Sequence, residues 1–264
     1  MNTPDATPRN KTIRDGLRLS IGMFTVIEVQ APEQVDKTRA AIALLFAPFA
    51  FAFWALLVGL ILQTGQGLGL DSLPLAAVGV TLLVLGNRAF HLDGLADTFD
   101  ALAASFDPER SLEVARLGNI GPAGLVAVVL ALLLQVTAGA ALIAQQHGVW
   151  IFVALACLAR GASVTGALRG VRAARPEGLG ETFSQSIPRW AGLVSWFSMI
   201  GASGGLAFAA GLDPWAGIYT AIGAGMAVAW LVRHCIKRFG GIIGDALGAS
   251  IEIAFTILLL GFAI

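Results

Sequence analysis

The sequence predicts an all-α protein, a polytopic membrane bundle of about seven transmembrane helices with an additional interfacial helix near its N-terminus. Composition is the first indication, because 56% of the 264 residues are hydrophobic and only 13% are charged. In soluble domains about half of the residues are apolar and about a quarter are charged. The mean hydropathy is +0.78. The second indication is a series of long apolar runs, and the third is the distribution of basic residues between them.

The apolar runs have the length of about 20 residues that a helix needs to cross a bilayer. They are residues 40–62, 73–91, 122–145, 149–168, 190–211, 214–232 and 246–264. Residues 1–39 precede them as a cytoplasmic or interfacial segment, and residues 40–264 form the bundle with short loops. No connecting stretch is long enough to fold alone. We therefore expect one integral membrane domain over residues 1–264.

The basic residues indicate the orientation, because Lys and Arg beside a span stay on the cytoplasmic side. The loops after the first, third and fifth runs, residues 63–72, 146–148 and 211–213, contain neither Lys nor Arg. Apart from Arg160 inside the fourth run, every basic residue lies in the N-terminal segment or close to a loop on the other side. We expect a multi-pass protein of the inner (plasma) membrane, with its N-terminus and active site cytoplasmic and its C-terminus outside.

Residues 11–29 predict the interfacial helix, because their apolar and charged side chains recur with helical spacing. The apolar set is Ile13, Leu17, Ile21 and Phe24, and the charged set is Lys11, Arg14, Asp15 and Arg18. A helix lying on the headgroups and a lid over the active site are both open interpretations. Pro48, within the first apolar run, predicts a kink.

Three aspartates follow the second run, in residues 91–100 (HLDGLADTFD). On a helix Asp93, Asp97 and Asp100 share one face at i, i+4 and i+7, and the apolar side chains lie mainly opposite. At the bilayer centre each would cost about 2.5 to 3.5 kcal/mol, so we expect them at the cytoplasmic mouth, partly in water and partly neutralised by an ion. Clustered carboxylates suit Mg²⁺, which shares its remaining ligand positions with substrate phosphate.

Residues 106–121 predict a short cytoplasmic helix that begins at Asp107-Pro108-Glu109. Arg110 and Glu113 are three residues apart, as are Glu113 and Arg116. Surface ion pairing and contact with substrate both explain these charges.

Two arginines are candidates for binding a phosphate group. Arg160 lies at membrane depth, where it either grips a phosphate with its planar guanidinium or pairs with one of the aspartates. Arg175 belongs to the loop run ARPEGLG (174–180), in which Gly178 is a further substrate-binding candidate. Attraction to anionic lipid is the alternative for this loop.

Glycines recur before the last apolar run, at Gly241, Gly244 and Gly248, with spacings of three and four. Such a strip lets another helix or a ligand approach the backbone closely, and both interpretations are open. Packing alone does not explain the acids Asp245 and Glu252 so near the membrane. The two cysteines occur singly, and we expect small buried hydrophobes at Cys157 and Cys235.

These blocks together resemble the cobalamin synthases (adenosylcobinamide-GDP ribazoletransferases). They come in the order of the family and cover about residues 85–250. The blocks are HLDGLADT (91–98) with Asp100, Arg110 with Leu112-Glu113, Ile120-Gly121, Ala174-Arg175-Pro176 with Gly178-Leu179-Gly180, and Gly244-Asp245 with Leu247-Gly248-Ala249. The chain departs from the family pattern at a few positions, which are Asn87-Arg88-Ala89, Ala101, Leu117-Gly118 and Ile243.

The resemblance implies a membrane transferase that joins α-ribazole, or its 5′-phosphate, to adenosylcobinamide-GDP and releases GMP, with Mg²⁺ as cofactor. It implies metal ligands at Asp93, Asp97 and Asp100, and catalytic roles for Asp97, Asp245 and His91, with Asp245 acting as a base or as a further metal ligand. For His91, a general base and local hydrogen bonding are both open. Substrate would be bound by Arg160, Arg175, Gly178, Gly241 and Gly244. Membrane lipid is an expected partner and nucleic acid is not; self-association and contact with other corrinoid-assembly enzymes are left open.

Two other classes remain as alternatives. A CDP-alcohol phosphotransferase of lipid synthesis also places Asp residues on membrane helices, but this chain lacks the longer pattern DGxxAR…GxxxDxxxD. A transporter would place polar residues near the midplane on broken helices, whereas nearly all charges of this chain gather near one membrane face.

Overall fold

The computed structural model describes residues 9–116 and 118–263. Within these ranges the chain forms helices and no β-strand, which confirms the predicted fold class. The helices are α1 (Arg9–Phe24), α2 (Lys37–Gly67), α3 (Ser72–Leu85), α4 (Phe90–Ala104), α5 (Pro108–Val114), α6 (Pro122–Ile143), α7 (Gly148–Arg160), the 3₁₀ helix η1 (Gly161–Ala167), α8 (Gly178–Phe183), α9 (Arg189–Ala209), α10 (Pro214–Phe239) and α11 (Asp245–Phe262).

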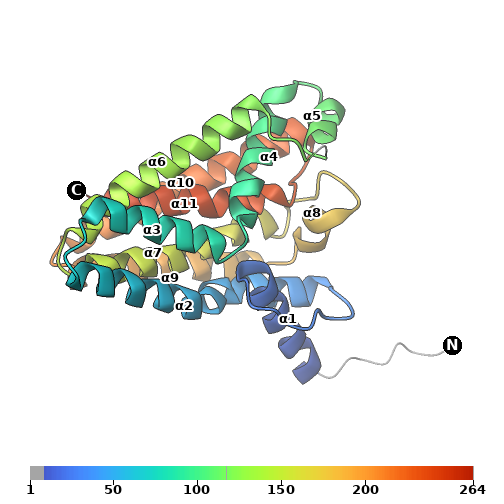
Figure 1. The fold of residues 1–264 in the computed structure, drawn as a ribbon. Coiled ribbons are helices and arrows are strands. Elements are labelled where there is room, and N and C mark those ends of the chain that lie inside the picture. Colours follow the sequence, from blue (N-terminus) through green and yellow to red (C-terminus); the bar gives the residue numbers. More distant parts are fainter. Residues whose placement is uncertain (1–8, 117, 264) are drawn as a thin grey trace.

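Six helical segments are long and apolar enough to cross a membrane, and they correspond to six of the seven predicted runs. They are α2, α6, α7 with η1, α9, α10 and α11. Pro48 lies inside α2 without ending it. The bundle has two distinct ends: α1, α4, α5 and α8 lie at one, called the site end below (Figure 1). The connections 68–71, 144–147 and 210–213 lie at the other.

The second predicted run is not one helix, and here the prediction of a continuous segment over residues 73–91 is wrong. α3 ends at Leu85, and α4 begins at Phe90 with its axis turned by 85°. Arg88 and Ala89 both have φ = 59°, a left-handed conformation that cannot continue a right-handed helix. This conformation costs about 1–2 kcal/mol for each non-glycine residue. α3 follows the bundle, whereas α4 lies across its site end and is not itself a spanning helix (Figure 1).

Contacts from other helices hold this corner. A side chain at Gly86 would place its Cβ 2.0 Å from Nε1 of Trp54, and this nitrogen donates to the carbonyl of Leu82 at 2.9 Å. The guanidinium of Arg88 donates to the carbonyl of Gly22 on α1 at 2.7 Å. The local hydrophobicity predicted that the helix would continue, but tertiary contacts with α1 and α2 stabilise the break.

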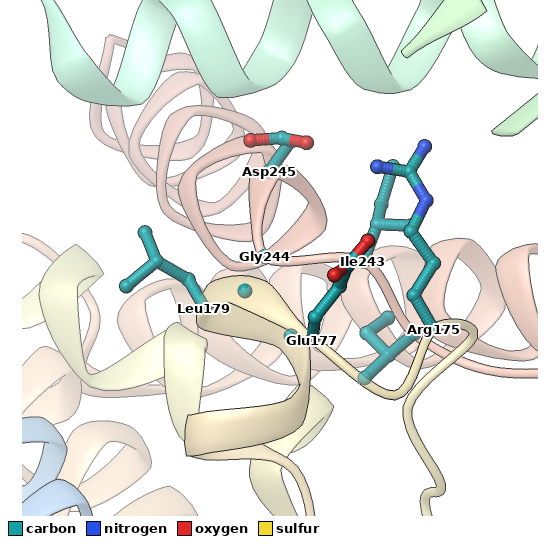
Figure 2. A pocket seen from close by; sticks show the side chains of 9 residues that line it. Arg175, Glu177, Leu179, Ile243, Gly244 and Asp245 are labelled. Atoms are coloured by element: carbon teal, nitrogen blue, oxygen red, sulfur yellow. The ribbon is translucent and has the colours of Figure 1, made fainter. Parts of the chain in front are cut away.

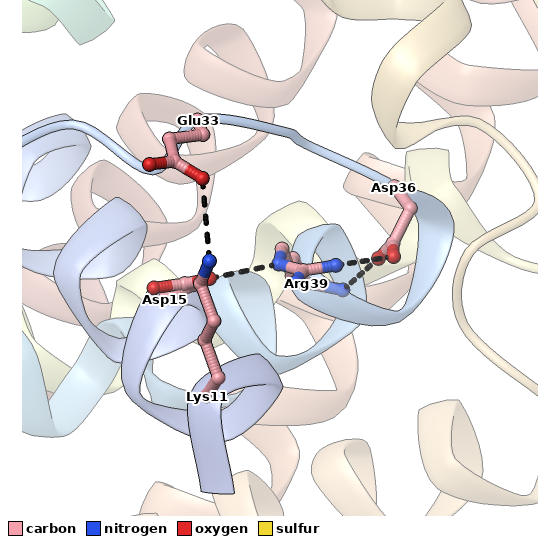
Figure 3. Close-up of polar contacts among 5 residues, drawn as sticks. All are labelled: Lys11, Asp15, Glu33, Asp36 and Arg39. Atoms are coloured by element: carbon pink, nitrogen blue, oxygen red, sulfur yellow. Dashed lines mark hydrogen bonds and ion pairs between the residues drawn. The ribbon is translucent and has the colours of Figure 1, made fainter. Parts of the chain in front are cut away.

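The helix α1 packs on α2 through a buried charge, not through a purely apolar face. Nε of Arg39 lies 3.3 Å from Oδ2 of Asp15, and its NH1 lies 2.5 Å from Oδ2 of Asp36 (Figure 3). Asp15, assigned from the sequence to the polar face, is 4% exposed, whereas Ile13 is 41% exposed. The predicted helix is confirmed, but its inward face is different, because Arg39 requires a buried carboxylate partner.

We expect Asp15→Ala to destabilise the protein by about 1–3 kcal/mol, because it leaves Nε of the buried Arg39 guanidinium without a partner while Asp36 still pairs with the other end of the group. Lys11→Ala is the matched control on the same helix, since the Lys11–Glu33 pair at 3.2 Å is exposed and contributes at most about 1 kcal/mol. Thermal unfolding in detergent measures both effects. Equal shifts for the two variants would contradict this account of α1 docking.

Candidate active site

A pocket opens at the site end, between the loop before α8, α8 itself and the turn that leads into α11. It is lined by Arg175, Glu177, Gly178, Leu179, Gly180, Ile242, Ile243, Gly244 and Asp245. Four of the residues predicted from the sequence therefore meet here, although two of them lie about 70 residues from the others in the chain. The Asp245 carboxylate and the Arg175 guanidinium point to the same side of the pocket (Figure 2).

Backbone pairing brings these two segments together. Ile242 donates its N–H to the carbonyl of Arg172 at 2.8 Å, and Ala174 donates to the carbonyl of Ile242 at 2.9 Å. A Cβ on Gly241 would lie 2.4 Å from the carbonyl carbon of Ala173. Gly241 thus permits close packing of the two segments and does not line the pocket. Of the two interpretations of the glycine strip, close approach of the backbone therefore applies to Gly241.

Arg175 connects the pocket to α5. Its guanidinium donates to the carbonyl of Leu112, and the neighbouring Arg116 lies 2.6 Å from the carboxylate of Glu177. Burial lowers the pKa of Arg175 from its ordinary value, and Arg116 adds to this effect while Asp245 opposes it. Of the two predicted pairs on α5, Arg110–Glu113 forms at 2.7 Å, whereas Arg116 bonds Glu177 instead.

Asp93 and Asp97 of α4 lie near enough to Asp245 to repel it electrostatically, where α4 crosses the start of α11. The crossing is close, because a Cβ on Gly94 would lie 2.6 Å from the carbonyl oxygen of Asp245. Burial raises the pKa of Asp97 from 3.8 to about 6, and repulsion from Asp93, then Asp245 and then Asp100, adds to this shift. Mutual repulsion of carboxylates on this scale favours a bound proton or a cation.

The donor set suits a hard cation, since carboxylate oxygens are the ligands that Mg²⁺ prefers. In the described residues, no group of three His, Cys, Asp or Glu side chains is arranged so as to hold a metal ion by itself. Mg²⁺ commonly takes one or two carboxylates and completes its shell with water and substrate phosphate. Asp93, Asp97 and Asp245 are the residues that would hold such an ion.

Asp100 occupies a different environment from the other acids of the motif. Its Oδ2 accepts from the N–H of Gly121 at 2.6 Å, and its Oδ1 accepts from the N–H of Gly124 at 2.8 Å. Asp100 is 7% exposed. Both oxygens thus satisfy amides at the start of α6, where a carboxylate is also favoured by the helix dipole. The helical spacing predicted the shared face but not this partner, which comes from a different helix.

His91 and Arg160 lie inside the bundle and do not line the pocket. His91 is 1% exposed, and its Nδ1 accepts from the amide of Asn87 at 2.9 Å. This is a local hydrogen bond of the kind that was one of the two interpretations for His91. Arg160 is 3% exposed, with its Cζ 3.3 Å from the ring centroid of Phe51. It is paired with none of the three aspartates within the described residues.

Sequence reasoning missed two residues. Glu177 lines the pocket although only its neighbours in the motif were singled out. Gln135, a lone amide in an apolar run, was also overlooked, although an isolated polar residue at membrane depth is itself a functional signal. It donates to Glu252 at 2.8 Å in the interior.

The fold and the pocket define an all-helical, multi-pass membrane protein with an acidic site at one end of its bundle. The chain belongs to the cobalamin-5-phosphate synthase family, whose model matches residues 16–263, and the resemblance seen in the sequence is confirmed. Three similar proteins are named adenosylcobinamide-GDP ribazoletransferase. That of Nocardioides sp. is 37% identical over 95% of this chain and 99% of its own length. That of Frankia casuarinae is 33% identical over 94% of each.

The third, from Pseudomonas fluorescens, is 32% identical over 93% of this chain and 98% of its own. No solved structure matches the chain. The departures from the family pattern lie in different places. Ile243 lines the pocket, Asn87 is in the interior, and Ala101 is fully buried. Leu117 lies outside the described residues.

The contrast between Asp97 and Asp100 predicts stability changes of opposite sign. Asp97→Asn should raise the unfolding temperature at pH 7.5 without divalent ions, because an acid whose pKa is raised by folding destabilises the folded state once it ionises. Asp100→Asn should lower it, because an amide can accept from only one of the two N–H groups, a loss of about 1.5–3 kcal/mol. Thermal unfolding of both variants in detergent is the measurement. Shifts of the same sign would contradict these assignments.

Proposed function

We propose that this protein joins α-ribazole, or its 5′-phosphate, to adenosylcobinamide-GDP, giving adenosylcobalamin, or its 5′-phosphate, and GMP. The observation that carries the proposal is the pocket that Arg175 and Asp245 line together, with Asp93 and Asp97 of α4 coupled electrostatically to Asp245. Membership of the cobalamin-5-phosphate synthase family and the names of the relatives support adenosylcobinamide-GDP and a ribazole as the substrates. An acidic cluster beside an arginine suits transfer of a phosphate-linked group, which relies on positioning and on neutralising charge.

The reaction forms a bond from the ribazole 3′-hydroxyl oxygen to the cobinamide-linked phosphorus and breaks the bond from that phosphorus to GMP. Arg175, which lines the pocket, offers its guanidinium to the phosphate oxygens. Asp97 is suited to accept the hydroxyl proton, because its pKa of about 6 is raised toward neutral. When bound at this cluster, Mg²⁺ supplies positive charge for the phosphate oxygens.

The site end would face the cytoplasm. Supporting this, the connections at the opposite end, residues 68–71, 144–147 and 210–213, contain no Lys or Arg, and such loops are typical of the outer side. Nucleotide substrates are soluble and reach a cytoplasmic pocket directly. We propose the inner (plasma) membrane as the location.

The test is release of GMP by purified protein given adenosylcobinamide-GDP, Mg²⁺ and either α-ribazole or its 5′-phosphate. We expect GMP and a cobalamin product from at least one acceptor, and none after chelation of Mg²⁺. Asp97→Asn should lower turnover on the order of 10²–10³-fold, as removal of a key electrostatic group does. Asp71→Asn is the matched control, because Asp71 is exposed at the opposite end of the bundle.

Absence of GMP with both acceptors would contradict the proposed reaction. Turnover of Asp97→Asn at the wild-type rate would instead contradict the site. Movement of substrate across vesicles without GMP release would favour the transporter alternative.

A further inference from the structure

A cluster of buried polar side chains lies in the interior beneath the α3–α4 corner, and is called the interior polar cluster below. Its members are between 1% and 6% exposed and come from the corner, α4, α6, α7 and α11: Asn87, His91, Gln135, Arg160 and Glu252. A small cavity is lined by all of them except His91, together with apolar side chains of α3 and Phe255. The cluster is separate from the pocket at the site end, since the two share no lining residue.

Two sets of hydrogen bonds lie within the cluster, one between α6 and α11 and one between the corner and α4. Nε2 of Gln135 on α6 donates to Oε2 of Glu252 at 2.8 Å and to Oγ1 of Thr256 at 3.2 Å, both on α11. Oε1 of Glu252 lies 3.9 Å from Nδ1 of His91. The amide of Asn87 bonds the same ring nitrogen at 2.9 Å. The two sets approach each other where His91 faces Glu252, and Asn87 and Glu252 line the same cavity, so α6 and α11 lie directly against the corner.

Arg160 supplies the charge that balances this cluster. Its guanidinium lines the same cavity as the Glu252 carboxylate, stacks on Phe51 and donates to the carbonyl of Ala156. A buried carboxylate or guanidinium is strongly unfavourable unless an opposite charge or hydrogen bonds compensate it. Arg160 and Glu252 line one cavity and carry opposite charges, so the direct partner of the Glu252 carboxylate is Gln135 and Arg160 acts on it across the cavity.

The cluster adjoins the part of α4 that carries the acids. Asn87 lies in the corner, and His91 lies in the first turn of α4, two residues before Asp93. Glu252 follows Asp245 by seven residues, about 10 Å along α11. Contacts at both places fix the crossing of α4 over α11: the cluster holds His91, and Gly94 packs on the carbonyl of Asp245.

We propose that Gln135, Glu252 and Arg160 are positioning residues: through His91 and Asn87 they hold α4 at its angle to the bundle, so that Asp93 and Asp97 face Asp245. None of them contacts substrate. This inference rests on the proposed function of the acidic cluster. It also gives Arg160 a role in place of the phosphate contact that the sequence predicted.

Kinetics give the first test. Gln135→Leu removes the amide that bonds Glu252, and we expect kcat to fall at least about tenfold while KM for adenosylcobinamide-GDP changes less than about threefold. The double variant Gln135→Glu, Glu252→Gln exchanges the two groups and keeps one carboxylate opposite Arg160, so it should recover most of the lost kcat. Ser250→Ala is the control, because Ser250 is buried on α11 but bonds only Ala246 of its own helix.

The second test measures the angle of α4 directly and needs no activity. Spin labels at Val78→Cys on α3 and Ala103→Cys on α4, both exposed, report the α3–α4 distance in a background with Cys157→Ala and Cys235→Ala. We expect a narrow distribution of label-to-label distances in the protein with the unmodified cluster and in Ser250→Ala. Gln135→Leu should broaden or shift it, and the exchanged double variant should restore it.

Unchanged distances in Gln135→Leu, or unchanged kcat, would overturn the proposal, as would a rise in KM alone. If Gln135→Leu does not fold, Glu252→Gln replaces it in both experiments. Its kcat and label-to-label distances should then differ from wild type and return toward it in the exchanged double variant. Failure of the proposed function is distinguishable, because it appears as a wild-type protein that releases no GMP, whatever the distances show.

Discussion

The crossing of α4 over the first turn of α11 is the contact on which the site depends. Gly94 allows it, because any side chain there would meet the carbonyl oxygen of Asp245 at 2.6 Å. Gly248 makes the matching approach one turn later, where a Cβ would lie 3.1 Å from Cα of His91. Without these two glycines the helices would separate, and carboxylates from distant parts of the chain would not share one place. A local packing constraint thus sets the electrostatics of the pocket.

The membrane explains where the remaining charges lie. A charge in the hydrocarbon region is expensive, so most of the charged side chains gather at the site end, where water reaches them. Those that are buried have partners of three kinds: Asp15 has Arg39, Asp100 has two backbone amides, and Glu252 has Gln135 with Arg160 nearby. Asp97 lacks such a partner and is repelled by Asp93 and Asp245, and mutual repulsion of this kind is typical of a functional site.

Much of the site could be predicted from residue type and spacing. Arg175, Gly178, Gly244 and Asp245 were all singled out, and they line one pocket, because short motifs that combine glycine with charge near a membrane face are typical of a ligand site. Predictions that needed a side-chain partner succeeded less well. Asp100 has the same chemistry as Asp97, and no local signal shows that Gly121 and Gly124 present their amides to one and not to the other.

The sequence by itself determined the fold class, the apolar spans and the concentration of charge near one end. The length of an apolar run decides whether it can span a bilayer, and the position of basic residues decides which side of the membrane a loop takes, so neither depends on tertiary contacts. Only the tertiary structure decided that α3 ends at Leu85 and that α4 turns by 85°. It also decided that His91 and Arg160 lie in the interior. The physical reason is that these features depend on partners distant in sequence, such as Trp54 beside Gly86 and Gln135 beside Glu252, which periodicity does not encode.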